Sequence, residues 1–342
     1  MDNKITKRRL SDFLSYEWIV IIVVCIALII AWEAVYAITS VKLTYGQKFK
    51  IAYDEYVDVD YNENIVGVTY GKKAFSYDVL SISTEGMSPG LDNELSIRYQ
   101  THDVDVLAVS CAERTSSDGE KFKRANSVVE NMDVWSYEKA VCDGDKYLTP
   151  LLKQGVTPIQ GYNVDRAYSK EDLDVSKIDD LFLTRMKKDN RYRKQEEKEQ
   201  GKILERQRIF KICEEVAFAK KLLRDFADRG IFNEYTRYTQ PLEQNVFLKD
   251  EAKIRLYEEK LRVEKQNNLN LYGKEKLSYG IRVDKLEYGD EYRSSQFFTV
   301  DGKAKEIVLL AFDFASVQPH LQFESLSFMN TVVRMCSWYG LA

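Results

Sequence analysis

The sequence predicts an α/β ectodomain of two lobes with a helical middle region, preceded by one transmembrane helix. Three observations carry this prediction: an apolar run near the N-terminus, strand-like and helical segments in the first and last thirds of the remaining chain, and a highly charged segment with helical periodicity between them. The chain has 342 residues, so about 300 remain after the apolar run. That length suffices for one two-lobed domain or two small ones.

These patterns divide the chain into five parts. We expect a cytoplasmic basic tail at 1–17, a transmembrane helix at 18–38, an α/β lobe at 40–175, a charged helical lobe or insertion at 176–275, and a return to the α/β lobe at 276–342. The composition, 44% apolar and 30% charged, is typical of a folded globular protein and excludes wholesale disorder. With 50 basic and 54 acidic residues, the net charge of -4 argues against a nucleic-acid partner.

The apolar run from Trp18 to Ile38 is long enough to cross a lipid bilayer. Its only charged residue is Glu33, and about 20 such residues span the ~30 Å hydrocarbon layer. Trp18, Trp32 and Tyr36 stand where interfacial aromatic residues anchor a membrane helix. The sequence therefore predicts a single-pass protein in contact with membrane lipid.

The charges before this run predict its orientation. Four basic residues precede it, namely Lys4, Lys7, Arg8 and Arg9. The positive-inside rule places them in the cytoplasm and the domain after residue 39 outside the cell membrane. A cleaved signal peptide is the alternative, since residues 35–37 offer a cleavage-like spacing, although Glu33 and Tyr36 interrupt it and the run is long for a signal peptide.

The first part of the ectodomain alternates strands with a helix. Residues 48–53 (KFKIAY) alternate polar and apolar side chains as a half-buried strand does, and residues 77–83 have the same character. A Ser-Pro-Gly break precedes an expected helix at 91–99. Residues 103–110 (DVDVLAVS) form a nearly continuous apolar run, which suits a strand covered on both faces, as in parallel sheets.

The middle of the chain predicts long helices with a solvated face. Of the 24 residues from 185 to 208, 15 are charged, and apolar residues recur at helical spacing from 204 to 223. Gly201 either divides this segment into two helices or costs about 1 kcal/mol within one. A partner-binding coiled coil is the alternative, weakened by the lack of a sustained heptad. Another helix is expected at 248–264.

The last part predicts a return to the α/β lobe. Residues 306–314 (EIVLLAFDF) are typical of a buried strand, and a helix is expected from Pro319 to about Met335. Residues 321–328 also alternate as a strand would, so this segment stays open between helix and strand. The near-copies at 276–280 (KLSYG) and 285–289 (KLEYG) are explained as strand-and-turn pairs.

The chain lacks the usual sequence motifs of catalysis. It has only two histidines, and no H-E-x-x-H, G-x-S-x-G, Walker or G-x-G-x-x-G motif. We therefore expect no catalytic residues, no metal site and no cofactor. The cysteines outside the apolar run are widely spaced, which leaves room for one or two disulfides.

Four residues are candidates for ligand binding. Asp103 and Asp105 flank the end of an expected strand, where α/β folds place their ligands, although charged residues are also ordinary strand termini. Trp135 and Tyr137 lie in a mixed stretch before an expected boundary near Pro150. Aromatic rings at such a place are either half-buried packing residues or platforms for sugars and other planar ligands.

The strand 48–53, the segment LSIRYQTHDVDVLAVS at 95–110 and the segment IVLLAFDFASVQPHLQFESLSFMNTVV at 307–333 carry a resemblance. Together they resemble the type-2 extracytoplasmic solute-binding proteins in degenerate form, and more closely uncharacterised membrane-anchored proteins of Gram-positive bacteria. The family commonly uses a lipidated cysteine where this chain has an apolar helix, and none of the family's ligand residues maps onto a position here.

The resemblance implies a bacterial cell-envelope protein that captures a ligand between two lobes. The expected function is a tethered, non-catalytic solute-binding module whose partners are a small solute or glycan and a transporter permease. The alternative is an envelope interaction or scaffold protein without a small-molecule ligand. A glycan-acting envelope enzyme comes third, because acidic residues are abundant enough to supply a catalytic pair.

Overall fold

The computed structural model describes residues 18, 20, 22–33, 35, 48–54, 57, 81–87, 92–115, 118–187, 192–239, 245, 246, 248–267, 273–286, 306–313 and 323–334. The chain forms two compact units, residues 1–45 and 46–342.

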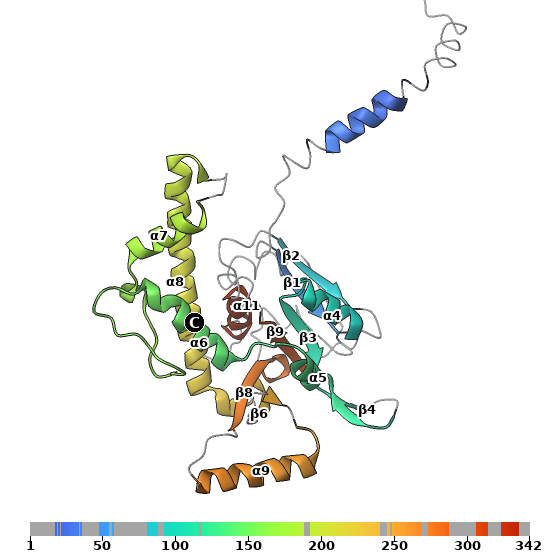
Figure 1. The fold of residues 1–342 in the computed structure, drawn as a ribbon, viewed down its shortest axis with the longest axis vertical. Helices are drawn as coiled ribbons and strands as arrows, with labels where there is room; N and C mark the ends of the chain where they lie inside the picture. Colours follow the sequence, from blue (N-terminus) through green and yellow to red (C-terminus); the bar gives the residue numbers. More distant parts are fainter. Residues whose placement is uncertain are drawn as a thin grey trace, which may run out of the picture. The chain divides into compact units, whose positions relative to one another are not determined.

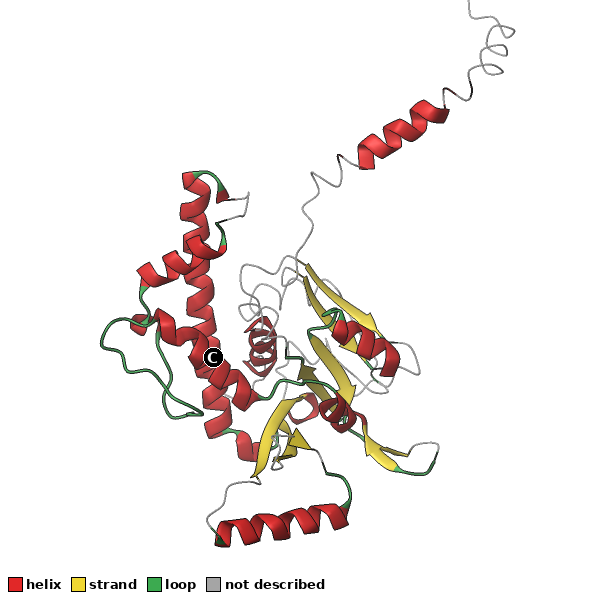
Figure 2. Cartoon of the chain, in the orientation of Figure 1, coloured by secondary structure: helices red, strands yellow, loops and turns green. Residues whose placement is uncertain are grey.

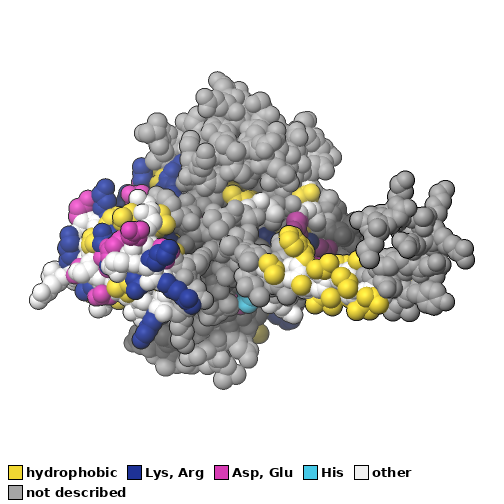
Figure 3. Space-filling view, turned by 90° about the horizontal axis from the view of Figure 1, so that it is seen from above, with side chains coloured by type: hydrophobic (Ala, Val, Ile, Leu, Met, Phe, Trp, Pro, Cys, Tyr) yellow, Lys and Arg dark blue, Asp and Glu magenta, His cyan; other side chains and the backbone are white. Residues whose placement is uncertain are grey.

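In the first unit, the described residues between 18 and 35 are helical, and their apolar side chains are exposed (Figure 3). Trp18 is 50% exposed and Trp32 is 71% exposed. Tyr36 and the four basic residues of the tail lie outside the described residues. Among the described residues, no helix combines the length and apolarity that a membrane span requires.

The second unit is built on a seven-stranded mixed sheet, which confirms the α/β class (Figures 1 and 2). The strands lie in the order β2-β1-β3-β9-β8-β6-β7. β2, β1 and β3 run parallel, and the neighbouring pairs from β3 onward are antiparallel. The bounds are β1 Lys48–Tyr53, β2 Ser81–Gly86, β3 Val106–Ser110, β6 Phe232–Thr239, β7 Asn245–Val246, β8 Gly273–Arg282 and β9 Ile307–Ala311. A separate hairpin pairs β4 (Glu113–Thr115) with β5 (Lys121–Lys123).

Helices cover both faces of the sheet, which explains the apolar run of β3. Val106 and Ala108 pack into one core, and Leu107 and Val109 into the other, because successive side chains of a strand point to opposite faces. α4 (Asp92–Gln100) and α5 (Arg124–Asn131) cover the second core. α6 (Tyr137–Leu148), α8 (Gln195–Asp225) and α11 (Phe323–Arg334) cover the first.

The structure of α11 settles whether the segment after Pro319 is a helix or a strand. Residues 323–334 are helical, so the strand alternative is wrong. Every residue from 323 to 333 is buried. A helix buried on all sides has no polar face, and periodicity therefore could not distinguish it from a strand.

Two helices of the charged middle region lie within residues 175–225, but Gly201 does not separate them. α7 (Val175–Arg185) and α8 are divided before residue 195, and Gly201 lies inside α8. A Cβ at this position would lie 2.2 Å from Cζ of Phe182 and 2.8 Å from Cε1 of Tyr192. The glycine is therefore required by the close packing of α7 on the first half of α8.

The middle of the chain also contributes strands to the sheet. β6 precedes the expected boundary at residue 275, and β8 contains it. β6 and β8 pair along their lengths, with a bulge where Gly280 has a φ of 79°. A Cβ at Gly280 would lie 2.2 Å from the Leu309 carbonyl oxygen, so the glycine of KLSYG serves the bulge. α9 (Glu251–Gln266) projects from the end of this strand pair (Figure 1).

Most element predictions of the outer parts are confirmed. β1 has the predicted bounds, α4 is displaced by one residue, and the predicted strand at 306–314 is β9. β2 begins at residue 81, and residues 77–80 lie outside the described part of the chain.

Candidate functional site

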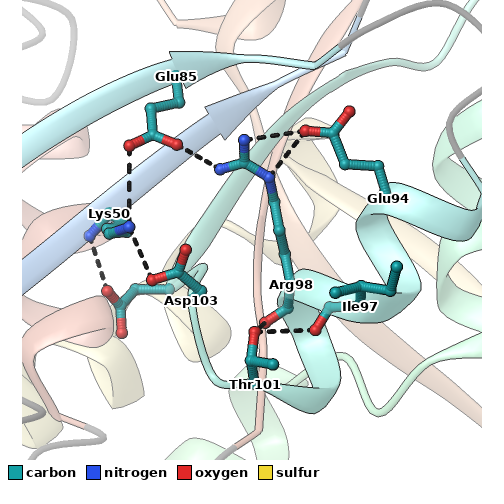
Figure 4. A network of polar contacts seen from close by, with 8 residues as sticks. Lys50, Glu85, Glu94, Ile97, Arg98, Thr101 and Asp103 are labelled. Carbon is teal, nitrogen blue, oxygen red and sulfur yellow. Dashed lines mark hydrogen bonds and ion pairs between the residues drawn. The ribbon is translucent and has the colours of Figure 1, made fainter.

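Asp103 and Asp105 lie at the amino-terminal end of β3. Asp103 belongs to a network of polar contacts around Lys50 and Arg98 (Figure 4). The Lys50 ammonium lies 2.7 Å from the Asp103 carboxylate and 3.7 Å from that of Glu85. The backbone N–H of Lys50 donates to Oδ2 of Asp105 over 2.7 Å. Because α/β sheets bind ligands beyond the carboxyl ends of parallel strands, these aspartates stand at the opposite end from such a site.

Burial gives Asp105 an unusual protonation equilibrium. It raises the pKa of the Asp105 carboxyl to about 7, although the hydrogen bond from the Lys50 backbone opposes the shift. Arg98 extends the network from α4 by binding Glu94 over 2.9 Å and pairing with Glu85. The group thus holds β1, β2, α4 and the start of β3 together.

Trp135 and Tyr137 are core residues, with exposed fractions of 2% and 1%. The backbone N–H of Trp135 donates to the Ala311 carbonyl over 2.8 Å. The Tyr137 ring meets Phe232 edge-on, with 4.9 Å between ring centroids. Neither ring offers a platform to a ligand from solution.

Sequence reasoning missed the charged residue at the carboxyl end of the parallel strands. Asp54 directly follows β1, is 2% exposed and donates its backbone N–H to the Ala108 carbonyl. Its carboxylate lies 3.8 Å from Nε of Arg124, the first residue of α5. Its place directly after KFKIAY was the available sequence clue.

The second unit contains a cavity of about 910 Å³. The end of α5, the start of α6, the segment between these helices, and strands β6 and β8 supply most of its lining, and Tyr99, Tyr162 and Asp313 complete it. None of the four candidates from the sequence lines it. Its volume falls within the range of small-molecule sites.

Each basic side chain in the lining is paired with an acidic one. Lys139 forms an ion pair with Asp313. Arg237 donates to Glu275 over 2.6 Å. Lys276, which also lines the cavity, pairs with Glu234 on β6.

Two other acids of the lining are held by neutral donors. The Tyr99 hydroxyl donates to Oδ2 of Asp133 over 3.1 Å. The backbone N–H of Ser278 donates to both carboxylate oxygens of Glu138, over 2.9 and 3.1 Å. A third acid, Glu130, accepts from the Tyr235 hydroxyl and pairs with the exposed Lys249.

Three tyrosines line the cavity and remain neutral near neutral pH. Burial, and then the charge of Asp133, raise the pKa of Tyr99 to about 12. Burial, and then Glu138, raise the pKa of Tyr162 to about 12. Burial also raises the pKa of Tyr279; the charge of Arg237 opposes this shift, and the charge of Glu138 adds to it. Their hydroxyls therefore remain hydrogen-bond donors, and their rings offer apolar faces.

The described residues include free thiols, of which that of Cys142 lines the cavity. No group of three or more histidine, cysteine or acidic side chains in the described part of the chain is placed to hold a metal ion. Cys25, Cys111, Cys142 and Cys213 are free thiols, and Cys336 lies outside the described residues. The cavity is suited to holding a polar solute through carboxylates, hydroxyls and rings.

The cavity could not be located from the sequence, because its lining comes from separated segments between residues 99 and 313 that the fold brings together. Comparisons with known proteins add no assignment, since no protein-family model, no curated protein and no solved structure matches the chain.

Proposed function

We propose that the chain is a membrane-tethered, extracytoplasmic, non-catalytic binding protein that captures a small polar solute, in the manner of the solute-binding proteins it resembles. The observation that carries the proposal is the cavity of about 910 Å³, where three tyrosines stand among carboxylates. Polar groups that converge on a cavity beside aromatic faces can fix the orientation of a small ligand.

A screen of thermal stability tests the capture of a solute. The full-length chain, in a non-ionic detergent, is heated with amino acids, small peptides, sugars, organic anions and organic amines. A ligand at 100 times its dissociation constant adds about 2.7 kcal/mol, which raises the melting temperature by several degrees. A reproducible shift with one chemical class is expected. Equal melting temperatures across the panel would contradict the proposal.

The tether is proposed from residues 18–38, with the N-terminus in the cytoplasm and the remainder outside, arranged as a two-lobed binding module. Tethering would keep a weak binder at high concentration near a transporter permease. The test is extraction of cell membranes with alkaline carbonate, combined with protease treatment of intact spheroplasts. We expect the protein to stay in the pellet and its C-terminal part to be degraded. Release into the supernatant would contradict the tether.

An interaction or scaffold protein is the second candidate, favoured by the exposure of α9. This helix carries Leu256 at 54% and Val263 at 44% exposure. Tyr257 attaches it to the sheet by donating to the Gly273 carbonyl over 2.7 Å. If α9 is the functional surface, replacing residues 247–270 with a short turn will abolish co-purification of an envelope partner without changing solute binding.

A further inference from the structure

We propose that the cavity selects organic cations, meaning small molecules that carry ammonium groups. This inference rests on the proposed capture of a solute and adds the charge and class of that solute. Two observations support it. The cavity lining contains more acidic than basic side chains, and Glu138 lines the cavity together with Tyr162 and Tyr279.

The lining is acidic, and its basic groups are already engaged. It contains three bases (Lys139, Arg237 and Lys276) and five acids (Glu130, Asp133, Glu138, Glu275 and Asp313). The difference gives the lining a formal charge of 3 - 5 = -2. Since every base is paired with an acid, an entering anion would have to break an ion pair. An entering cation breaks none.

Two acids remain for such a cation. Within the described part of the chain, Asp133 and Glu138 accept hydrogen bonds from neutral donors and form no ion pair. A carboxylate has about four lone-pair sites, so each keeps room for a further donor. An ammonium group offers up to three donors and the opposite charge.

Glu138 is the better candidate to bind the cation because it shares the lining with two aromatic rings. It lines the cavity together with Tyr162 and Tyr279, and its charge acts on the hydroxyls of both. Tyr162 is 53% exposed, so its ring is open to a ligand. Aromatic faces attract ammonium groups, and a carboxylate in the same lining completes a site for an organic cation.

Isothermal titration of the full-length chain with three compounds of the same carbon-chain length tests the charge selection. These are putrescine, butanediol and succinate, which differ in carrying ammonium, hydroxyl and carboxylate ends. We expect putrescine to bind, with an affinity that falls as salt rises. Butanediol and succinate should bind at least about tenfold more weakly, because neither gains charge-assisted hydrogen bonds from ammonium groups to the carboxylates of the lining.

Matched variants locate the site. Glu138→Gln should weaken putrescine binding by about tenfold, whereas Glu196→Gln, on the exposed first turn of α8, should leave it unchanged. Tyr162→Ala should weaken binding by about threefold to tenfold, and Tyr162→Phe should leave it within about twofold, because the ring supplies the attraction. Circular dichroism confirms that each variant is folded.

The outcomes separate this inference from the proposed function. Binding of putrescine that Glu138→Gln does not alter would overturn the assigned site. If the stability screen finds a sugar or an anion that binds while putrescine does not, the cation inference fails and solute capture stands. If no compound of either experiment binds, both fail.

Discussion

Lys220 is almost completely buried in an ion pair of the second unit, at 1% exposure. Its ammonium donates to Oδ2 of Asp145 and to the Arg166 carbonyl, each over 2.6 Å. The lysine thereby joins α8 to α6 and to the loop that carries Tyr162. Burial raises the pKa of Asp145 despite the opposing effect of Lys220, which shows how poorly solvated this carboxylate is.

Removing the lysine should leave that carboxylate buried and unpaired. We expect Lys220→Met to lower the free energy of unfolding by about 3 to 5 kcal/mol, measured by urea denaturation at pH 7. Lys221→Met, at the partly exposed neighbouring position, is the control and should change it by less than about 0.5 kcal/mol. Equal effects of the two substitutions would show that the buried pair does not stabilise the fold.

Asp105 should make stability depend on pH. Its folded-state pKa of about 7 is above the usual value for an aspartate, so the folded protein holds a proton that the unfolded chain releases. Its contribution is fully present below about pH 4 and is lost as pH rises through 7, by roughly 2 to 4 kcal/mol. Asp105→Asn should flatten this part of the profile in urea denaturation between pH 4 and 8. A wild-type profile that rises over this range, with the same slope in the variant, would contradict the prediction.

The surroundings of Asp103 and Asp105 depend on how the sheet is assembled, which the sequence pattern does not show. The apolar run identified β3, but hydrophobic periodicity does not show that Lys50 of the neighbouring strand engages the two aspartates before it. Asp103 and Asp105 precede β3, whereas Asp54 follows β1. Trp135 and Tyr137 were ambiguous because an aromatic residue in an irregular segment suits a core as well as a site.

Among the elements, α7 and α8 depend on the missing side chain of Gly201. The ring of Phe182 occupies the space that a Cβ would take, and it meets Tyr192 edge-on at 5.1 Å between centroids. The intrinsic gain of about 1 kcal/mol from alanine in a helix competes with this clash. Overpacking of a tight contact typically costs about 1 to 3 kcal/mol.

We therefore expect Gly201→Ala to destabilise the protein by about 1 to 2 kcal/mol. The double variant Gly201→Ala with Phe182→Leu should be less destabilised than the sum of its single changes, because the smaller side chain admits the methyl group. Chemical denaturation of the four proteins gives the coupling. A stabilising Gly201→Ala would mean that helix propensity outweighs packing here.

Elements with a regular pattern were predictable, and those that depend on partners were not. β1, α4 and β9 follow from their local patterns. β6 (FNEYTRYT) is polar at most positions and lies in a charged region, so only its pairing with β8 stabilises it as a strand. The helix α11 is buried on every side and left no periodic trace.

At the scale of the whole molecule, the fold assembles the cavity from distant segments. β9 runs antiparallel to β3, so Asp313 emerges beside the end of α5, where its backbone N–H donates to the Asp133 carbonyl over 2.8 Å. The pairing of β8 with β6 then brings Glu275 and Arg237 together. Sheet order, which no local pattern encodes, creates the site.

The most direct test of solute capture is to close this cavity and measure the loss of stabilisation by a ligand. Asn131 is an exposed residue of the lining, and Asn131→Trp places an indole there. Gln207→Trp, on an exposed position of α8, is the matched control. We expect the compound that best stabilises the wild-type protein to raise the melting temperature of the control equally and that of Asn131→Trp by less than half as much. Equal shifts in all three proteins would contradict binding in this cavity.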